Sequence, residues 1–245
     1  MESLFEHTLK WKPEDFERQM KINAIISEPW HGIEFYDPLM LNDLHRLLIE
    51  LYTFFKNAEY QISDPITLVN NYVKSNIKVR ASYFDCLNGE VDTFPESELF
   101  YRTGYAALTR HEAMCAGFAE STRLLLALFN IESYTLLAKL PGANKQLLHY
   151  LVIAVDDNNE FRILDPERQA NCERKGYDFQ KYLDQMTFIL PDEHFAQNKV
   201  GKTGVGEKAM DFLQRETTIK ANGITGAYEL AKVMKERGYQ RCINK

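Results

Sequence analysis

The sequence has no long apolar segment. Its apolar runs are short, such as LLLALF at 124–129, whereas a helix needs roughly 18–20 apolar residues to cross a membrane. The first residues, MESLFEHTLKWKPEDFERQM, do not place a basic segment before an apolar stretch, so we expect no secretory signal. The expected location is therefore the cytoplasm without membrane attachment, although a missing signal does not exclude specialised secretion.

Cysteine and positive charge are also scarce. The four cysteines, Cys86, Cys115, Cys172 and Cys242, show no CxxC spacing, which argues against a disulfide framework or a cysteine-rich zinc site. The formal net charge is −6 and there is no large basic block, so phosphate neutralisation, and with it nucleic-acid binding, is not expected. In a reducing compartment each cysteine is then either a packing residue or a nucleophile.

What is present is the composition of an ordinary globular protein. Hydrophobic residues make up 45% and charged residues 26% of the chain, which excludes disordered and fibrous classes. A chain of 245 residues can bury a sizeable core, either as one domain with extensions or as two small domains.

Helical patterns dominate the first part of the chain and the end. Leucine and phenylalanine recur at i, i+3 and i+4 over 41–55, and Asp64-Pro65 opens a second amphipathic segment. Residues 115–130 form a strongly apolar helical run, and 207–237 read as one or two terminal helices. Between them, residues 133–140, 148–155 and 161–165 are β-type runs. Helices, then a helix leading into an antiparallel sheet, then helices predict the α+β class.

The polar residues 156–160 suit the loop of a hairpin between the last two runs. If these five residues close it, Val155 faces Phe161, Leu151 lies opposite Asp165, and His149 is one diagonal step away. Opposed residues point to the same face, so His149 and Asp165 would come within hydrogen-bonding reach. A loop of even length would place them on opposite faces.

Cys115 stands at or near the start of the apolar helix, in HEAMCAGFAE. The positive end of the helix dipole and the unpaired N–H groups there favour the nucleophilic thiolate. The small Ala116 and Gly117 would let a substrate carbonyl approach, and the N–H of Cys115 could help to hold a developing oxyanion. The alternative is that Cys115 is a buried cysteine on a core-facing helix.

His149 and Asp165 have ordinary interpretations when each is taken alone. A histidine that begins the apolar run HYLVIAV can be a satisfied structural residue, and an aspartate before proline often marks a turn or a strand end. On one face of a hairpin, however, the carboxylate would fix the tautomer of the imidazole and stabilise the imidazolium. Together with Cys115, the pair predicts a Cys-His-Asp catalytic set.

These residues resemble the transglutaminase-like superfamily of papain-like Cys-His-Asp cysteine enzymes. The motif residues are Cys115-Ala116-Gly117-Phe118-Ala119, His149 and Leu164-Asp165-Pro166, in the order of the family and with spacings of 34 and 16 residues. The resemblance covers about 64–190. The sequence departs from the family in two places, because His149 is followed by Tyr150-Leu151 rather than Ala-Trp, and Pro166 is followed by Glu167 rather than Thr.

The resemblance implies a catalytic core over 61–195, in which the cysteine helix packs on an antiparallel sheet, between helical extensions over 1–60 and 196–245. It also implies acyl transfer, with no cofactor or metal, on a peptide or protein amide. In this chemistry Cys115 attacks the carbonyl, His149 moves the proton, Asp165 orients the imidazole and a thioester forms.

The choice of acyl acceptor stays open. Water would give a protease, amidase or deamidase, which is slightly favoured, and an amine would give a transglutaminase. A catalytically silent module that binds a peptide or protein is the rival interpretation. Tyr105 is the candidate for a second oxyanion donor, with Tyr101 and Tyr83 as alternatives.

Two other patterns are set aside. His111 and Cys115 would share a face of a continuous helix, but no further ligand has matching spacing, so a zinc site is not expected. Val200-Gly201-Lys202-Thr203 resembles the end of a phosphate-binding loop, but Ala196 stands where that loop requires glycine.

Overall fold

The computed structural model describes residues 16–26, 36–59, 64–80, 96–140, 148–156, 161–189 and 224–225. The helices are α1 (Phe16–Ile26), α2 (Pro38–Glu59), α3 (Pro65–Asn76), α5 (Glu96–Leu99), the 3₁₀ helix η3 (Phe100–Arg102), α6 (Gly104–Arg110), α7 (Cys115–Leu128), α8 (Pro166–Lys175) and α9 (Phe179–Leu183). The strands are β1 (Lys78–Val79), β2 (Glu112–Ala113), β3 (Ser133–Lys139), β4 (Leu148–Val155), β5 (Phe161–Leu164), β6 (Thr187–Ile189) and β7 (Ile224–Thr225).

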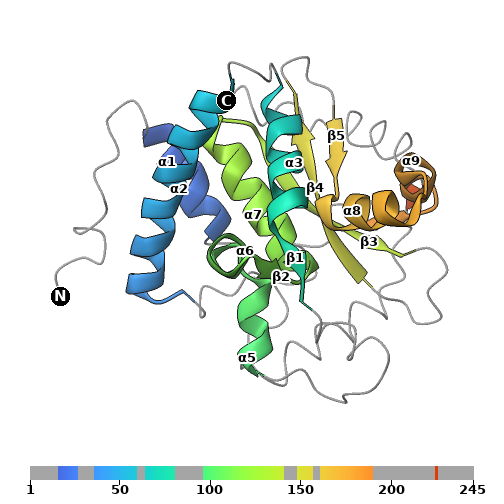
Figure 1. Ribbon diagram of the computed structural model, residues 1–245, viewed down its shortest axis with the longest axis horizontal. Helices are drawn as coiled ribbons and strands as arrows, with labels where there is room; N and C mark the ends of the chain where they lie inside the picture. The colour runs from blue at the N-terminus through green and yellow to red at the C-terminus, as the bar shows by residue number, and fades with distance from the viewer. Residues whose placement is uncertain are drawn as a thin grey trace.

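The main sheet has five strands in the order β5-β4-β3-β6-β7, and all its pairs are antiparallel. A short parallel pair, β1 with β2, lies beside it and links the end of α3 to the chain that enters α7. Figure 1 shows α7 between α1 and α2 on one side and the sheet with α8 on the other. The predicted α+β class is thus confirmed.

Helix α7 is the centre of the core because every one of its residues is buried. It packs against α1, α2, α3 and α6 as well as against β3 and β4. Side chains alternate along a strand, and β4 accordingly divides its residues between two apolar clusters. Tyr150, Val152 and Ala154 join the cluster around α7, whereas Leu151 and Ile153 join a smaller cluster with residues of α9 and β6.

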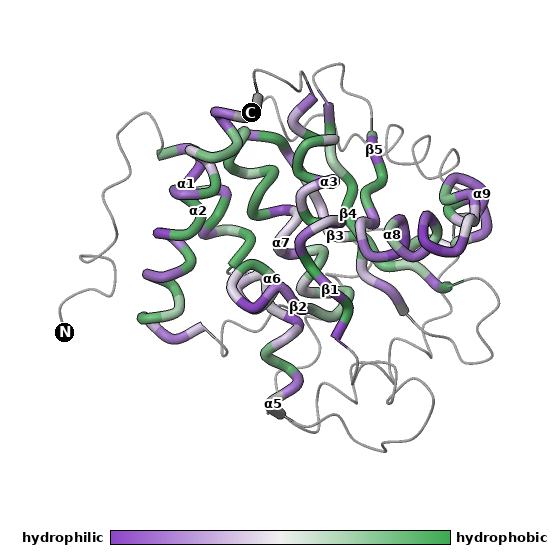
Figure 2. The backbone as a smooth tube through the Cα atoms, in the orientation of Figure 1, coloured by the Kyte–Doolittle hydropathy of each residue, from purple (hydrophilic) through white to green (hydrophobic). Residues whose placement is uncertain are grey.

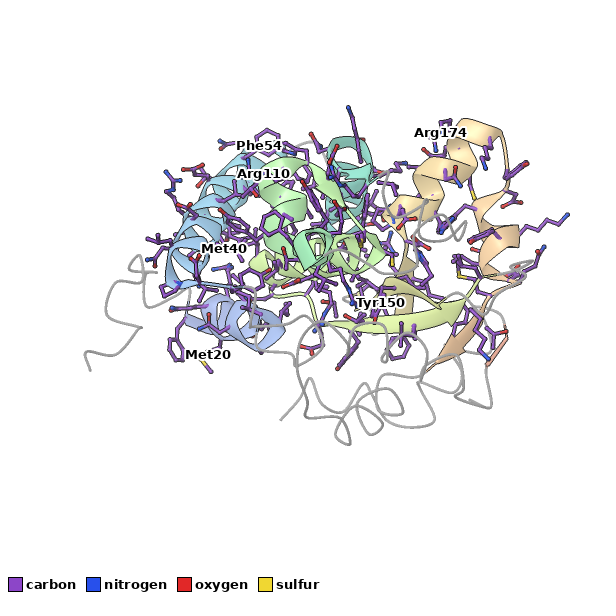
Figure 3. All side chains as sticks on the ribbon, turned by 90° about the horizontal axis from the view of Figure 1, so that it is seen from below. Met20, Met40, Phe54, Arg110, Tyr150 and Arg174 are labelled. Atoms are coloured by element: carbon purple, nitrogen blue, oxygen red, sulfur yellow. The ribbon has the colours of Figure 1, made fainter. Side chains whose placement is uncertain are left out.

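The surface helices show the expected separation of polar and apolar residues. Hydrophilic and hydrophobic residues alternate along α2, and α8 is mainly hydrophilic (Figure 2). Figure 3 places Met20, Met40 and Phe54 on the side of the N-terminal helices and Arg174 of α8 at the other side, with Tyr150 of β4 between them. No helix in the described part of the chain combines the length and the apolar character that a membrane crossing requires.

The N-terminal helices are attached to the C-terminal end of α7. Nε of Arg18 donates to the carbonyl of Leu128 at 2.7 Å, and Nζ of Lys21 donates to the carbonyl of Asn130 at 2.8 Å. At 1.5 Å per residue, these carbonyls lie roughly 20 Å along the helix from Cys115. The contacts of α1 therefore stabilise the end of α7 that is remote from the thiol.

A buried carboxylate joins α6, α7 and the segment before α2. Oε1 of Glu120 accepts a hydrogen bond from the Tyr36 hydroxyl at 2.9 Å, and Oε2 accepts one from the N–H of Gly104 at 2.8 Å. The Tyr36 hydroxyl in turn accepts from the N–H of Tyr105 at 3.2 Å. Because both oxygens have donors, the carboxylate is compatible with its complete burial.

Most predicted elements are present. The helices over 41–55, from 65 and over 115–130 and the three β-type runs are confirmed, with ends that differ by a few residues. The 224–225 segment was expected to be helical but forms β7, because two β-branched residues can pair with β6. The rest of 196–245 lies outside the described residues, and the domain boundaries at 60 and 195 stay predictions.

Gly117 supplies a test of how α7 is packed. A Cβ atom there would lie 2.7 Å from the carbonyl oxygen of Tyr101 and 3.0 Å from that of Thr103. Backbone atoms cannot rotate away, so we expect Gly117→Ala to lower the free energy of unfolding by about 1–3 kcal/mol, measured by urea denaturation. At Gly176, which has φ +68° and open space around it, Gly176→Asn should lower it less. Equal losses would contradict the packing argument.

Candidate active site

The position of Cys115 is fixed by the backbone just before α7. Met114 is the N-cap in extended conformation, and Cys115 is the first helical residue. The N–H of Met114 donates to the carbonyl of Tyr101 at 2.8 Å, and its own carbonyl accepts from the N–H of Phe118 at 3.0 Å. The thiol therefore lies at the N-terminus of a 14-residue helix, as predicted, and it is 5% exposed.

The segment that holds Met114 is itself braced. The guanidinium of Arg80 lies 4.2 Å from the ring centroid of Tyr101 and bonds the carboxylates of Glu98 at 3.1 Å and Glu112 at 2.8 Å. These contacts connect β1, α5, η3 and β2 around the entry to α7. Such a framework keeps the start of α7 in place because its own side chains are fixed by several partners.

The small residues after Cys115 pack closely in the structure. Ala116 is buried, and Gly117 faces the backbone of Tyr101 and Thr103 at distances that leave no room for a side chain. The glycine is therefore required for the close approach of α7 to η3. The roles predicted for Ala116 and Gly117 toward a substrate carbonyl stay predictions.

The register of the β4–β5 hairpin brings His149 to Asp165. Val155 pairs with Phe161 and Val152 with Leu164, which confirms the predicted alignment. Within the described strands, β5 pairs with no residue of β4 before Val152, so the first half of β4 extends beyond it. Asp165 follows β5 directly, and its Oδ2 lies 2.8 Å from Nε2 of His149, with both side chains almost fully buried.

Asp165 also begins a helix, which the interpretation as a strand end missed. It is the N-cap of α8, with Pro166 in the first turn, and its Oδ1 accepts a hydrogen bond from the N–H of Arg168 at 3.0 Å. One carboxylate thus caps α8 and bonds the imidazole. Helix α8 is tied to α3 by the pairs Asn70–Gln169 and Lys74–Glu173, each at 2.7 Å.

The charges around His149 determine its protonation. Burial lowers the pKa of the imidazole, but the negative charges of Asp165 and Glu167, the hydrogen bond to Asp165 and the contact with Cys115 together raise it to about 10. The imidazolium is therefore the stable form at neutral pH. Nε2 is bonded to Asp165, which leaves Nδ1 as the nitrogen available to the thiol.

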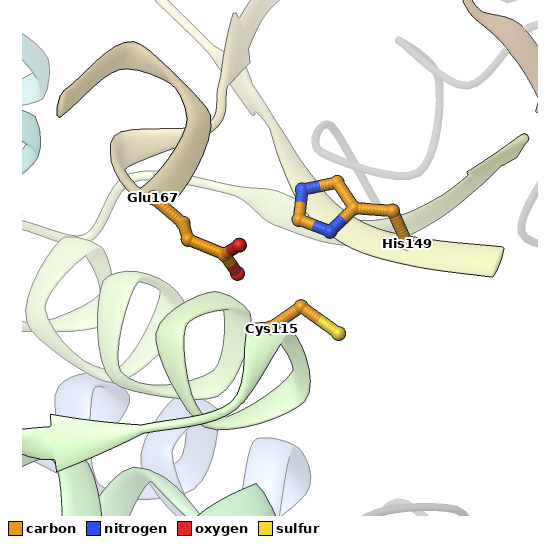
Figure 4. A group of neighbouring side chains, drawn as sticks. All are labelled: Cys115, His149 and Glu167. Carbon is orange, nitrogen blue, oxygen red and sulfur yellow. The ribbon is translucent and has the colours of Figure 1, made fainter. Parts of the chain in front are cut away.

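Glu167 is a member of this site that the sequence interpretation did not propose. Its carboxylate, a ring nitrogen of His149 and Sγ of Cys115 all lie within 4.8 Å of one another, and all three residues are buried (Figure 4). Burial raises the pKa of Glu167, although His149 and Arg168 act in the opposite direction. The sequence marked Glu167 only as a departure from the family, since its burial depends on how α8 packs.

The remaining candidates lie around this group. Tyr105 is in α6, with its ring centroid 6.0 Å from that of Phe100, and its role as an oxyanion donor stays a prediction. Tyr83 lies outside the described residues. His111 has φ 56° and ends α6, so no continuous helix joins it to Cys115 and the condition for a His111–Cys115 zinc pair is not met. Cys172 is buried on α8.

Comparison with known proteins finds similarity only among solved structures. No family model matches the sequence, and no curated protein is significantly similar to it. The crystal structure of a transglutaminase aligns with 63% of this chain and 38% of its own, at 17% identity and a TM-score of 0.42. A candidate cysteine protease from Cytophaga hutchinsonii aligns with 62% of this chain and 48% of its own, at 12% identity and a TM-score of 0.33. Each match thus spans less than half the length of the solved protein.

Proposed function

We propose that the chain is a cysteine-dependent acyl-transfer enzyme that acts on peptide or protein amides. The observation that carries the proposal is the buried hydrogen bond between Nε2 of His149 and Oδ2 of Asp165, beside a thiol at the start of α7. In this arrangement Cys115 is the nucleophile, His149 is the acid and base, and Asp165 orients the imidazole.

The first half of the reaction forms a thioester. The Cys115 thiolate, stabilised by the imidazolium and by the positive end of α7, attacks the amide carbon. The carbonyl oxygen becomes an oxyanion, to which the N–H of Cys115 can donate because the first N–H groups of a helix have no intrahelical acceptor. The intermediate then expels the amine, which takes the proton from His149.

The second half transfers the acyl group to an acceptor. Neutral His149 removes a proton from the acceptor as it attacks the thioester carbon, and the thiolate leaves. Water gives an acid and therefore amide hydrolysis, whereas an amine gives a new amide. We propose hydrolysis as the main reaction because Cys115 is only 5% exposed, and water is the smaller acceptor.

The same burial supports a second candidate function, a module that binds a peptide but does not react with it. A substrate carbonyl can meet Sγ of Cys115 only if the surroundings of the thiol move. The hydrogen bonds from Arg18 and Lys21 of α1 lie at the other end of α7, so these two bonds do not hold the surroundings of the thiol. Chemical labelling of the thiol separates the two functions.

The reactivity of Cys115 is the first test. Iodoacetamide at near-neutral pH should alkylate Cys115 faster than Cys172. Burial raises the pKa of the Cys172 thiol and so reduces its thiolate fraction. We expect peptide mass spectrometry to find the adduct on Cys115 and Cys115→Ala to abolish the fast phase. A vinyl or amide probe should give the same selectivity.

The matched control is Cys172→Ser, which should leave the fast phase intact. If Cys115 reacts no faster than the other cysteines, the thiol has no special activation and the silent module becomes the better proposal.

Asp165→Asn tests the orienting carboxylate, since asparagine can still cap α8. A histidine with a raised pKa stabilises the fold fully below its ordinary pKa of 6.5, and this contribution is lost as pH rises through about 10. We therefore expect Asp165→Asn to lower the His149 pKa, followed by NMR, and to destabilise the protein more at pH 6.5 than at pH 10. Activity should fall roughly 10²–10⁴-fold. An unchanged titration midpoint would show that Asp165 does not set the charge of His149.

A further inference from the structure

Two buried polar atoms of the site have no hydrogen-bond partner, and the proposed reaction uses only one of them, Nδ1 of His149. Oε2 of Glu167 and Nδ1 of His149 are buried and have no hydrogen-bond partner. Their side chains are 4% and 0% exposed, respectively. Buried polar atoms are almost always paired, so two such atoms beside one thiol indicate that the site accommodates a further group.

We propose that Sγ of Cys115, Nδ1 of His149 and the carboxylate of Glu167 form a binding site for one Zn²⁺ ion. The side chains of these three residues approach one another from the start of α7, from β4 and from the start of α8 (Figure 4). Thiolate, imidazole and carboxylate are the ligand types that zinc prefers, and three protein ligands leave a fourth position for water or a substrate atom.

The surroundings of His149 fit a zinc ligand. A histidine that binds zinc usually donates its other ring N–H to a carboxylate, which fixes the tautomer and directs the lone pair to the metal. Nε2 of His149 makes this bond with Asp165 at 2.8 Å, and Asp165 is held by the N–H of Arg168. The same bond that orients the imidazole for acyl transfer therefore leaves Nδ1 directed to a cation.

The distances allow the ion with a small closing movement. Zinc bonds of 2.0–2.3 Å place tetrahedral ligand atoms about 3.5 Å apart, whereas one ligand atom from each of the three residues, a ring nitrogen in the case of His149, lies within 4.8 Å of the other two. Glu167 can supply the movement, because Oε2 has no hydrogen-bond partner and Oε1 makes a long contact of 3.4 Å with Nε of Arg168.

The charge of the site also favours a divalent cation. The thiol of Cys115 and the carboxyl groups of Asp165 and Glu167 surround one imidazole, so three groups that can carry negative charge lie beside one that can carry positive charge. Binding of Zn²⁺ would release the imidazole proton from Nδ1 and replace one positive charge by two. A sulfur bonded to zinc cannot attack an amide, so zinc would also inhibit the proposed reaction. This consequence rests on the proposed function, whereas zinc binding itself does not.

Metal binding can be measured without any substrate. The full chain, treated with a chelator and dialysed, is titrated with ZnCl₂ by calorimetry and with CoCl₂ by absorption spectroscopy. We expect one Zn²⁺ per chain, and a thiolate-to-cobalt charge-transfer band that Cys115→Ser removes. Glu167→Gln should weaken zinc binding by about tenfold or more. The matched control, Glu173→Gln, changes an exposed carboxylate on the same helix and should leave zinc affinity unchanged.

Protection from alkylation gives a readout in the unaltered protein. Zn²⁺ should slow iodoacetamide labelling of Cys115, and a chelator should restore it. No binding, binding without the cobalt band, equal affinity in the Glu167→Gln protein, or unprotected Cys115 would each overturn the proposal. Selective labelling of Cys115 without zinc binding would support the proposed function and refute the zinc site. Zinc binding without rapid alkylation of Cys115 would support the zinc site and refute the proposed function.

Discussion

The hydrogen bond between His149 and Asp165 is the interaction on which the site depends. It joins β4 to the start of α8, and both partners are almost fully buried. A buried charge is strongly destabilising when it loses its partner, so each residue requires the other to be in place. Because Asp165 also caps α8, any shift of that helix would move the carboxylate and with it the imidazole.

The thiol is positioned by a separate set of contacts. The N–H of Met114, the residue before Cys115, donates a hydrogen bond to the carbonyl of Tyr101. The absence of a side chain at Gly117 allows the first turn of α7 to lie against η3. The imidazole thus comes from the sheet and the sulfur from the helix, and the packing of α7 on β4 determines their separation. The contacts of Arg80 and Glu120 hold the helical side of this arrangement.

The parts that could be predicted are those encoded locally. The hairpin register follows from the parity of a five-residue loop, and this register predicts the His149–Asp165 pair from the sequence alone. The start of α8 could also be predicted, because Asp165-Pro166 repeats the N-cap and proline pattern of Asp64-Pro65 at the start of α3. The Asp64-Pro65 pattern was interpreted correctly as a helix start. Strand β7 could not be foreseen because its pairing with β6 joins residues far apart in the chain. The burial of Glu167 depends in the same way on tertiary packing, and glutamate is rarely buried.

The pKa shifts of His149 and Glu167 have a common origin. Burial disfavours the charged form of both groups. For His149 the surrounding negative charge outweighs burial and raises the pKa to about 10. For Glu167 burial itself raises the pKa. Each shift favours the protonated form of the group, because buried groups cannot share an excess of negative charge with water. At the proposed zinc site, a divalent cation would offset the same negative charge. The proposed acid–base role of His149 and the proposed affinity for zinc would therefore have the same electrostatic cause.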